Sequence, residues 1–471
     1  MKYQAYEEYK DSGVEWLEDV PEHWVVSKFG YVKTVLTDFT ANGSFADLKK
    51  NVIYRDEPSY ARLVRLTDLR KNLENENGVW IDEDAYNYLS KSALYGGEFL
   101  LANVGAYAGL FYQMPDNKGH ASLAPNMFMA KFDDTKINRE YMAYVGQSSS
   151  ANEQLKLNAT AASAQPKLNK DDFKSIRFTY PKACEQIKIA SFLDHETAKI
   201  DTLIEKQQQL IKRLKENRQA VISHAVTKGL NPSTPMRDSG IEWLGEAPEH
   251  WAVSALKYHV DTVNGFGFSS SDVCEEGVPF IRAGNIKKKS ITPTDLYLPQ
   301  SVVDRYKRVI LSEGDIVISM VGSDPRILES AVGQIGVVPK SMEGSVPNQN
   351  VVILREKSDS ILKQFLFYTL CSDPYRNHLN VFSHKLANQS IISSSLIVNA
   401  KFMIPGTDEQ KKIIDFLDQR LKKIDEVVMK NYSSLELLWE RRTALISAAV
   451  TGKVDVRSWQ APNKSNKDAI A

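Results

Sequence analysis

Two long segments of the chain carry apolar residues at a spacing of seven, with charged residues on the other faces. They span residues 184–229 and 408–454, and no proline interrupts either one. This pattern, kept over roughly four heptads, predicts two long helices that pair as a coiled coil. The apolar residues seven apart are Leu193, Ile200, Leu214 and Val221 in the first segment and Leu417, Ile424, Leu438 and Leu445 in the second. Their companions on the same stripe are Ile204, Ile211 and Ala225, and Val427, Leu435 and Ala448.

One polar residue interrupts each seam at the same place in the repeat, Gln207 in the first and Asn431 in the second. A polar side chain at a core position of a coiled coil fixes register and partner orientation at some cost in stability. We therefore expect Gln207 and Asn431 to lie where the two helices cross. The alternative is that each helix packs alone against its own domain.

The segments that precede the helices, residues 1–183 and 230–407, mix short apolar runs with glycine and asparagine. Such a mixture is typical of strands joined by tight turns. Residues 455–471 form a short polar tail that we expect to be disordered. The predicted fold class is α+β, with two mixed α/β domains joined by two long coiled-coil helices.

The chain also repeats itself. Residues 11–17 return as residues 238–244 at a shift of 227, and Glu185-Gln186 returns as Glu409-Gln410 at a shift of 224. A duplicated chain tends to fold with a pseudo-twofold axis, and duplex DNA is a common twofold partner. Away from these repeats the two mixed blocks differ almost entirely, as two readers of two different ligands would.

Composition narrows the function classes only a little. The chain has 471 residues, 42% of them hydrophobic, and a formal net charge of zero. A neutral total does not exclude DNA, because phosphate neutralisation needs only local lysine and arginine. Three widely separated cysteines predict neither a disulfide framework nor a metal site. The polar N-terminus is unlike a signal peptide and no apolar run is long enough to span a bilayer, so we expect a cytoplasmic protein without a membrane partner.

A search for catalytic motifs finds none that is convincing. The chain has no phosphate-binding G-x-x-x-x-G-K-[ST] loop, no H-E-x-x-H zinc motif and no G-x-S-x-G nucleophile turn. Residues 373–375 (Asp-Pro-Tyr) lack the second proline of the similar motif in amino-group DNA methyltransferases. The repeated tryptophans Trp16 and Trp243, and Trp24 and Trp251, are interpreted as packing residues. The repeated histidines His23 and His250 are interpreted as capping or hydrogen-bonding residues. The sequence therefore predicts a protein that is not itself an enzyme.

Clustered basic and amide side chains provide candidate DNA contacts. Arginine and asparagine are well suited to bidentate contacts with guanine and adenine in the major groove. Basic residues gather at matched places in the two mixed blocks. A second matched pair of segments, residues 165–167 and 388–390, lies about sixteen residues before the proline that precedes each long helix. The candidate DNA-binding residues are Arg62, Arg65, Arg70, Lys71, Asn103, Lys167, Arg282, Asn285, Lys287, Lys288, Lys289 and Gln389. The alternative is that these are ordinary solvated loops.

Several of these motifs together resemble the specificity (S) subunit of a type I restriction–modification system. The carriers are residues 228–232 (Lys-Gly-Leu-Asn-Pro) leading into 238–245 and 248–251, the Glu-Gln and Phe-Leu-Asp pairs of both helices, and residues 450–457. The order of the four blocks matches as well, so the resemblance covers essentially the whole chain. No single motif is specific, but their combination is.

The resemblance implies two target recognition domains, residues 1–183 and 230–407, and two conserved spacer helices packed antiparallel. Each domain would read one half of a split DNA sequence. It also implies assembly with two methyltransferase (M) subunits and with restriction (R) subunits. S-adenosylmethionine, ATP and Mg²⁺ would belong to those partners, and this chain would hold no cofactor.

Two other functions stay open at this point. One is an enzyme, either a DNA methyltransferase or a nuclease, whose site the motifs fail to reveal. The other is a purely structural coiled-coil adaptor that does not touch DNA. Clustered arginine and asparagine in loops that differ between the halves favour the DNA reader over the adaptor.

Overall fold

The computed structural model describes residues 4–69, 73–75, 77–105, 107–160, 166–241, 244–322, 332–357, 359–382, 384–386 and 389–461. The chain forms two compact units. Unit 1 contains residues 1–208 and 433–471, and unit 2 contains residues 209–432. The division falls inside two long helices, α8 (Ala183–Lys228) and α13 (Thr407–Val450). How the chain divides into folding domains at residues 183, 229, 407 and 454 therefore stays a prediction.

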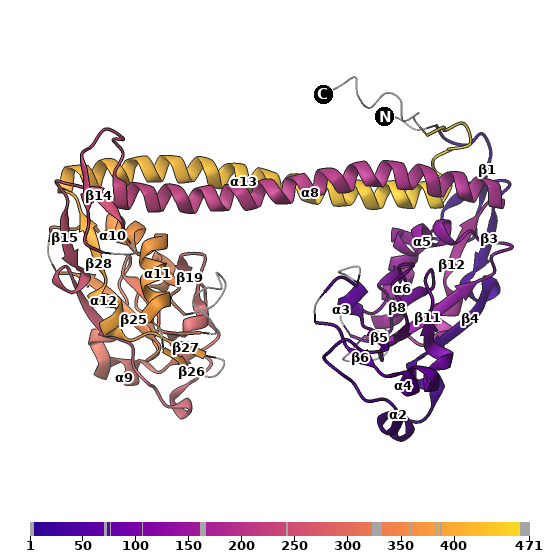
Figure 1. The fold of residues 1–471 in the computed structure, drawn as a ribbon, viewed down its shortest axis with the longest axis horizontal. Helices are drawn as coiled ribbons and strands as arrows, with labels where there is room; N and C mark the ends of the chain where they lie inside the picture. Colours follow the sequence, from indigo (N-terminus) through magenta and orange to yellow (C-terminus); the bar gives the residue numbers. More distant parts are fainter. Residues whose placement is uncertain are drawn as a thin grey trace. The chain divides into compact units, whose positions relative to one another are not determined.

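The two long helices pair antiparallel within each unit. In unit 1 the first part of α8 lies beside the last part of α13 (Figure 1), where the Arg442 guanidinium donates to the Asp201 carboxylate at 2.8 Å. In unit 2 the Arg218 guanidinium donates to Asp425 at 2.9 Å. Asp201 and Asp425, like Arg218 and Arg442, are repeat equivalents at the 224-residue shift. The predicted pairing of the helices is confirmed.

The apolar seam is close to the predicted one but drifts along the helix. Leu193, Ile200 and Ile211 are buried as expected, whereas Leu214 is only partly buried and Val427 is exposed. An α-helix has 3.6 residues per turn, so a strict seven-residue spacing rotates around it by about 20° per heptad. Gln207 and Asn431 belong to different units, so the expectation that they lie where the two helices cross stays a prediction. The Gln207 amide oxygen is buried without a described partner, and the Asn431 amide donates to Val427 of its own helix.

Unit 1 holds a hairpin, two four-stranded sheets and a two-stranded sheet, with strand orders β1-β2, β6-β5-β10-β7, β4-β11-β8-β9 and β12-β3. Its strands are β1 (Tyr9–Asp11), β2 (Asp19–Pro21), β3 (Val25–Lys28), β4 (Lys33–Asp38), β5 (Ala61–Val64), β6 (Trp80–Ile81), β7 (Ala93–Leu94), β8 (Phe99–Ala102), β9 (Phe111–Gln113), β10 (Ala121–Leu123), β11 (Met127–Phe132) and β12 (Arg177–Tyr180). Its shorter helices are α1 (Phe29–Val32), α2 (Phe45–Asn51), α3 (Leu66–Leu69), α4 (Glu83–Tyr88), α5 (Arg139–Gln147), α6 (Ser149–Thr160) and α7 (Lys170–Ser175).

Unit 2 has strand orders β13-β14, β15-β28, β16-β25-β21-β23-β19-β18, β20-β17-β24 and β22-β27-β26. Its strands are β13 (Met236–Asp238), β14 (Glu246–Pro248), β15 (Ala252–Ala255), β16 (Val260–Asn264), β17 (Val278–Ile281), β18 (Ile286–Lys287), β19 (Ser290–Ile291), β20 (Tyr297–Leu298), β21 (Ile316–Ser319), β22 (Val321–Gly322), β23 (Ile335–Val337), β24 (Val346–Pro347), β25 (Val351–Glu356), β26 (His384–Leu386), β27 (Gln389–Ile391) and β28 (Lys401–Ile404). Its shorter helices are α9 (Gln300–Val303), α10 (Lys363–Leu370), α11 (Asp373–Phe382) and α12 (Ser394–Asn399).

The two units share a common set of strand pairings. In each unit the first two strands form a hairpin, an antiparallel strand pair (β3 with β12, β15 with β28) follows it, and a parallel pair (β5 with β10, β17 with β24) lies further along. The central antiparallel strands β4-β11-β8 correspond to β16-β25-β21. The predicted fold class is confirmed as a repeated mixed α/β unit with a paired helix.

Each unit has its own core, formed by sheet residues together with one end of both long helices. In unit 1 the core includes Phe29, Tyr141, Phe192 and Ala449, which are at most 1% exposed. In unit 2 the core includes Phe365, also fully buried. The long helices are thus structural parts of both units. Among the described residues, no helix combines the length and the apolar character that a bilayer span requires.

Candidate nucleic-acid interface

The repeated Glu-Gln pair joins the start of each long helix to its unit. The Glu185 carboxylate accepts from the Tyr6 hydroxyl at 2.6 Å and from the Trp24 indole N–H at 3.0 Å. The His23 Nε2 atom lies 3.0 Å from the same carboxylate. Because Trp24 is 1% exposed, the interpretation of this tryptophan as a packing residue is confirmed.

Unit 2 repeats this arrangement at the start of α13. The Glu409 carboxylate accepts from the Trp251 indole at 3.1 Å and lies 2.8 Å from His250 Nε2. Trp251 is also 1% exposed. The following glutamine, Gln410, bonds only to main-chain groups, through its oxygen to the Leu362 amide and through its nitrogen to two carbonyls. These side chains join each long helix to its unit, so any recognition of a DNA sequence has to come from other residues.

An arginine stands at the carboxyl end of the central parallel strand in both units. The Arg65 main-chain amide, after β5, donates to the Asp68 carboxylate at 2.8 Å. The Arg282 amide, after β17, donates in the same way to the Asn285 side chain at 2.9 Å. The shared turn therefore presents an arginine at the same place in each unit, which agrees with the matched positions seen in the sequence.

The two arginines differ in how firmly they are held. The Arg65 guanidinium donates to Asp68 at 3.0 and 3.1 Å and to the Asn77 carbonyl at 2.6 Å. The Arg282 guanidinium lies 3.8 Å from Asp295, and its side chain is 55% exposed. Asn285 uses its amide nitrogen to donate to the Pro293 carbonyl. Asn285 thus positions Arg282, and the arginine is the more available of the two for contact with DNA.

Arg62 corrects the expectation from the sequence. This residue is only 7% exposed, and its guanidinium donates to the Leu73 carbonyl at 2.5 Å and to the Asn75 side chain at 2.8 Å. It also lies 3.3 Å from Asp68, which is 0% exposed. A buried arginine bound to its own unit is unavailable for base contacts, so Arg62 stabilises the loop that carries Arg65. Arg70 and Lys71 lie outside the described residues.

The buried Asp68 predicts a pH dependence of stability in unit 1. Burial opposes its ionisation, but hydrogen bonds from Arg65 and Asn75 outweigh burial and hold the pKa of Asp68 below its usual range. A depressed folded-state pKa stabilises the fold above the unfolded value of about 3.9, and this contribution is lost as the pH falls through the folded value. We expect Asp68→Asn to lower the free energy of unfolding of unit 1 by about 1–3 kcal/mol at neutral pH. The difference from the wild type should narrow in acid, where the wild-type carboxyl group is protonated.

Hydrogen exchange of unit 1 amides across the acid range would measure this effect. A matched control is Asp171→Asn, because Asp171 is a fully exposed carboxylate beside Lys174 in the same unit. A constant difference between Asp68→Asn and the wild type at every pH would contradict the linkage.

The lysine cluster of unit 2 lies at a tight hairpin turn. Lys288 and Lys289 join β18 to β19 with φ angles of 50° and 62°. Hairpin turns with two left-handed residues usually contain Asn-Gly, and a lysine with this positive φ angle is sterically strained. Lys287 and Lys288 are exposed, whereas Lys289 is partly buried. The turn therefore directs its lysines into two environments, with Lys287 and Lys288 exposed and Lys289 partly buried.

Two further candidate residues, Asn103 and Lys167, are brought close together within unit 1. In unit 1 the Leu168 amide donates to the Asn103 carbonyl at 2.8 Å, and an isolated bridge joins Val104 to Lys167. Unit 2 repeats this contact, since the Ile392 amide donates to Met320 at 2.9 Å. Asn103 and Lys167 thus share one edge of unit 1. Gln389 begins β27 at the equivalent edge of unit 2, but its side chain lies outside the described residues.

The sequence analysis missed a group of cations on α8 and α11. Lys212, Lys215 and Arg376 line one cavity of unit 2 together with Lys289. Charged residues of α8 were assigned to its solvent faces, and no sequence spacing connects residue 212 with residue 376. No described group of three or more His, Cys, Asp and Glu residues could hold a metal ion.

Comparison with known proteins identifies the class to which this geometry belongs. A family model described as the type I restriction modification DNA specificity domain matches residues 22–213 and 248–432. The MjaVIII specificity subunit of Methanocaldococcus jannaschii is 26% identical over 451 residues, covering 93% of this chain and 95% of the relative. The EcoKI specificity subunit of Escherichia coli is 21% identical, covering 94% and 92%.

A solved structure also shares the fold. It comes from work on complex assembly and conformational transition of the type I restriction–modification system. It superposes with a TM-score of 0.65 at 16% identity, covering 92% of this chain and 99% of that one. The chain belongs to the type I restriction–modification DNA specificity family. It is a specificity subunit that recognises DNA, and the family domain occurs twice along the chain.

Proposed function

We propose that this subunit reads a bipartite duplex target, one half with each unit, and that it contains no catalytic centre. The observation that carries the proposal is the contrast between scaffold and loops. The helix-joining contacts of Glu185 and Glu409 are repeated, whereas the arginine turns differ in their partners, Asp68 in unit 1 and Asn285 in unit 2. Repeated joints with unlike reading loops suit two different half-sites.

We further propose that the catalytic chemistry belongs to partner subunits. Two methyltransferase subunits and restriction subunits would bind S-adenosylmethionine, ATP and Mg²⁺. The named relatives are specificity subunits, and the solved relative comes from a study of complex assembly. The chain lacks the common phosphate-loop and zinc motifs. DNA methylation or cutting by the purified chain with S-adenosylmethionine and Mg²⁺, in the absence of partners, would contradict this division of work.

Arg282 provides a direct test of the reading loops. We expect Arg282→Ala to weaken binding at one half-site by about 1–3 kcal/mol, because an arginine can donate two hydrogen bonds to a guanine edge. Arg282 is the better target of the two arginines, since its guanidinium has only a distant partner at 3.8 Å. The measurement is the affinity for duplexes in which single base pairs of the target are changed.

Arg282→Lys is the matched control, because it keeps the charge but loses the planar fork. A base-reading role predicts that both variants lose selectivity at the same target position. A phosphate-binding role predicts that lysine restores affinity on every sequence. Unchanged affinity and selectivity in both variants would remove Arg282 from the interface.

A further inference from the structure

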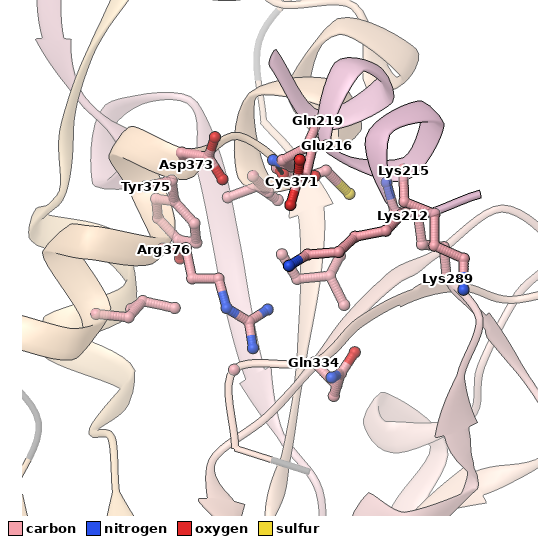
Figure 2. A pocket seen from close by; sticks show the side chains of 14 residues that line it. Lys212, Lys215, Glu216, Gln219, Lys289, Gln334, Cys371, Asp373, Tyr375 and Arg376 are labelled. Atoms are coloured by element: carbon pink, nitrogen blue, oxygen red, sulfur yellow. Dashed lines mark hydrogen bonds between the residues drawn. The ribbon is translucent and has the colours of Figure 1, made fainter. Parts of the chain in front are cut away.

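Unit 2 contains a cavity of about 600 Å³ whose lining comes from five parts of the chain. They are α8, Lys289 in the β18–β19 turn, the residues at the start of β23, the end of α10 with Cys371, and α11. In Figure 2 the Arg376 guanidinium and the Gln334 amide project into the hollow from different sides. Part of the lining is apolar and is called the floor here; it includes Ile335, Leu370 and Leu379. The charged lining residues are Lys212, Lys215, Lys289, Arg376, Glu216 and Asp373.

The cations in this lining outnumber the acids. Asp373 is also engaged within the fold, since it accepts from the Ser223 hydroxyl at 3.2 Å. Lys215 donates to the Tyr432 hydroxyl at 2.9 Å, so its ammonium is held at one side. Lys212 is exposed on α8. The cavity thus combines an apolar floor with a rim that favours an anion.

Two of these cations lie partly out of water and near other cations. Burial lowers the pKa of Lys289, and the neighbouring Arg218 and Arg376 lower it further, although Cys371 and Asp425 act in the opposite direction. Burial also lowers the pKa of Arg376, with Asp373 and Cys371 opposing the shift. Holding like charges close together costs free energy, and an anion bound in the cavity would lower that cost.

Unit 1 has the same frame without the cations. The contact between the Asp373 amide and Ser223 at 2.9 Å has its equivalent in the contact between the Ser149 amide and Ser447, also at 2.9 Å. Lys212, Lys215 and Arg376 have the repeat equivalents Glu436, Trp439 and Asn152 at the 224-residue shift. The scaffold therefore does not require positive charge here, and the cations of unit 2 serve some other purpose.

We propose that this cavity binds the sugar–phosphate backbone of the DNA target, and that unit 2 supplies more of the electrostatic grip on the duplex than the equivalent place in unit 1. The inference rests on the proposed function, because it takes DNA as the ligand. Lysines act as point charges toward phosphate, and a phosphate contact orients the duplex without reading bases. The apolar floor would pack against deoxyribose.

The test uses the full chain carrying Lys212→Gln, Lys289→Asn and Arg376→Gln together. Asparagine is chosen at position 289 because it tolerates the left-handed backbone of this turn. Affinity for the target duplex and for a scrambled duplex is measured over a series of salt concentrations. We expect affinity to fall by about 10- to 100-fold on both duplexes, and the slope of log affinity against log salt to shrink by about 2–3.

The matched control removes two exposed lysines from α13, Lys411→Gln with Lys412→Gln, neither of which lines the cavity. An equal loss of DNA affinity in this control, or an unchanged salt slope in the triple variant, overturns the proposal that the cavity binds phosphate. Selectivity between target and scrambled duplex is expected to survive in the triple variant. If the wild-type chain shows no such selectivity, the proposed function fails instead. If it binds neither duplex, both fail.

A measurement on the wild-type chain avoids any folding defect of the variants. Lysine acetylation with and without target duplex is followed residue by residue by mass spectrometry. We expect DNA to protect Lys212 and Lys289 and to leave Lys412 unprotected. Equal acetylation of Lys212 and Lys289 with and without bound DNA overturns the inference.

Discussion

Glu185→Ala is expected to reduce the free energy of unfolding of unit 1 by about 3–5 kcal/mol, because the substitution breaks a buried hydrogen-bond network around a charged acceptor. Glu185 is 7% exposed and accepts from the Tyr6 hydroxyl and the Trp24 indole. Both donors stay buried after the substitution, since Tyr6 is 5% and Trp24 1% exposed. Their lost hydrogen bonds are therefore not replaced by water.

The equivalent substitution in unit 2 provides the control. The Glu409 side chain is 33% exposed, so water can reach the groups that Glu409→Ala leaves behind, and we expect a cost of about 1–2 kcal/mol. Hydrogen exchange of the amides near Trp24 and near Trp251 would measure the two units separately. If Glu185→Ala lowers the free energy of unfolding no more than Glu409→Ala does, burial does not determine how much this network contributes to stability.

Exchanging residues 31–180 for those of another family member is expected to replace one half of the recognised DNA sequence and leave the other half unchanged. The structure explains why the graft should dock. The Gln186 side chain of α8 bonds to the Lys136 and Pro181 carbonyls and the Asn138 amide, which are main-chain groups present whatever the side chains. A different set of reading loops can therefore be placed on the same joint.

The reciprocal exchange of residues 258–404 should change only the other half. There Gln410 bonds to the main chain of Ser360, Leu362 and Pro405, so the joint is again independent of side-chain identity. Mapping methylated adenines in cells that carry each exchange, together with the partner subunits, would read both halves at once. A change in both halves, or in neither, would refute the assignment of one half-site to each unit.

The helix pair and the duplication follow from short-range regularities of the sequence. Apolar spacing identified α8 and α13 because each turn of a helix repeats the same geometry, and the structure confirms both helices. The partial exposure of Leu214 was not predicted, since it depends on how tightly the two helices wind around each other.

What the sequence by itself determined is the repeated scaffold, with its two helices, its paired motifs and the family to which they point. Tertiary structure alone decided which charged residues face outward. Arg62 and Arg65 are three positions apart, yet one is buried and the other reaches the surface of the turn. Lys289, Lys212 and Arg376 line one cavity although they come from segments far apart in the chain. Local periodicity carries no information about such contacts, because they depend on how whole elements pack.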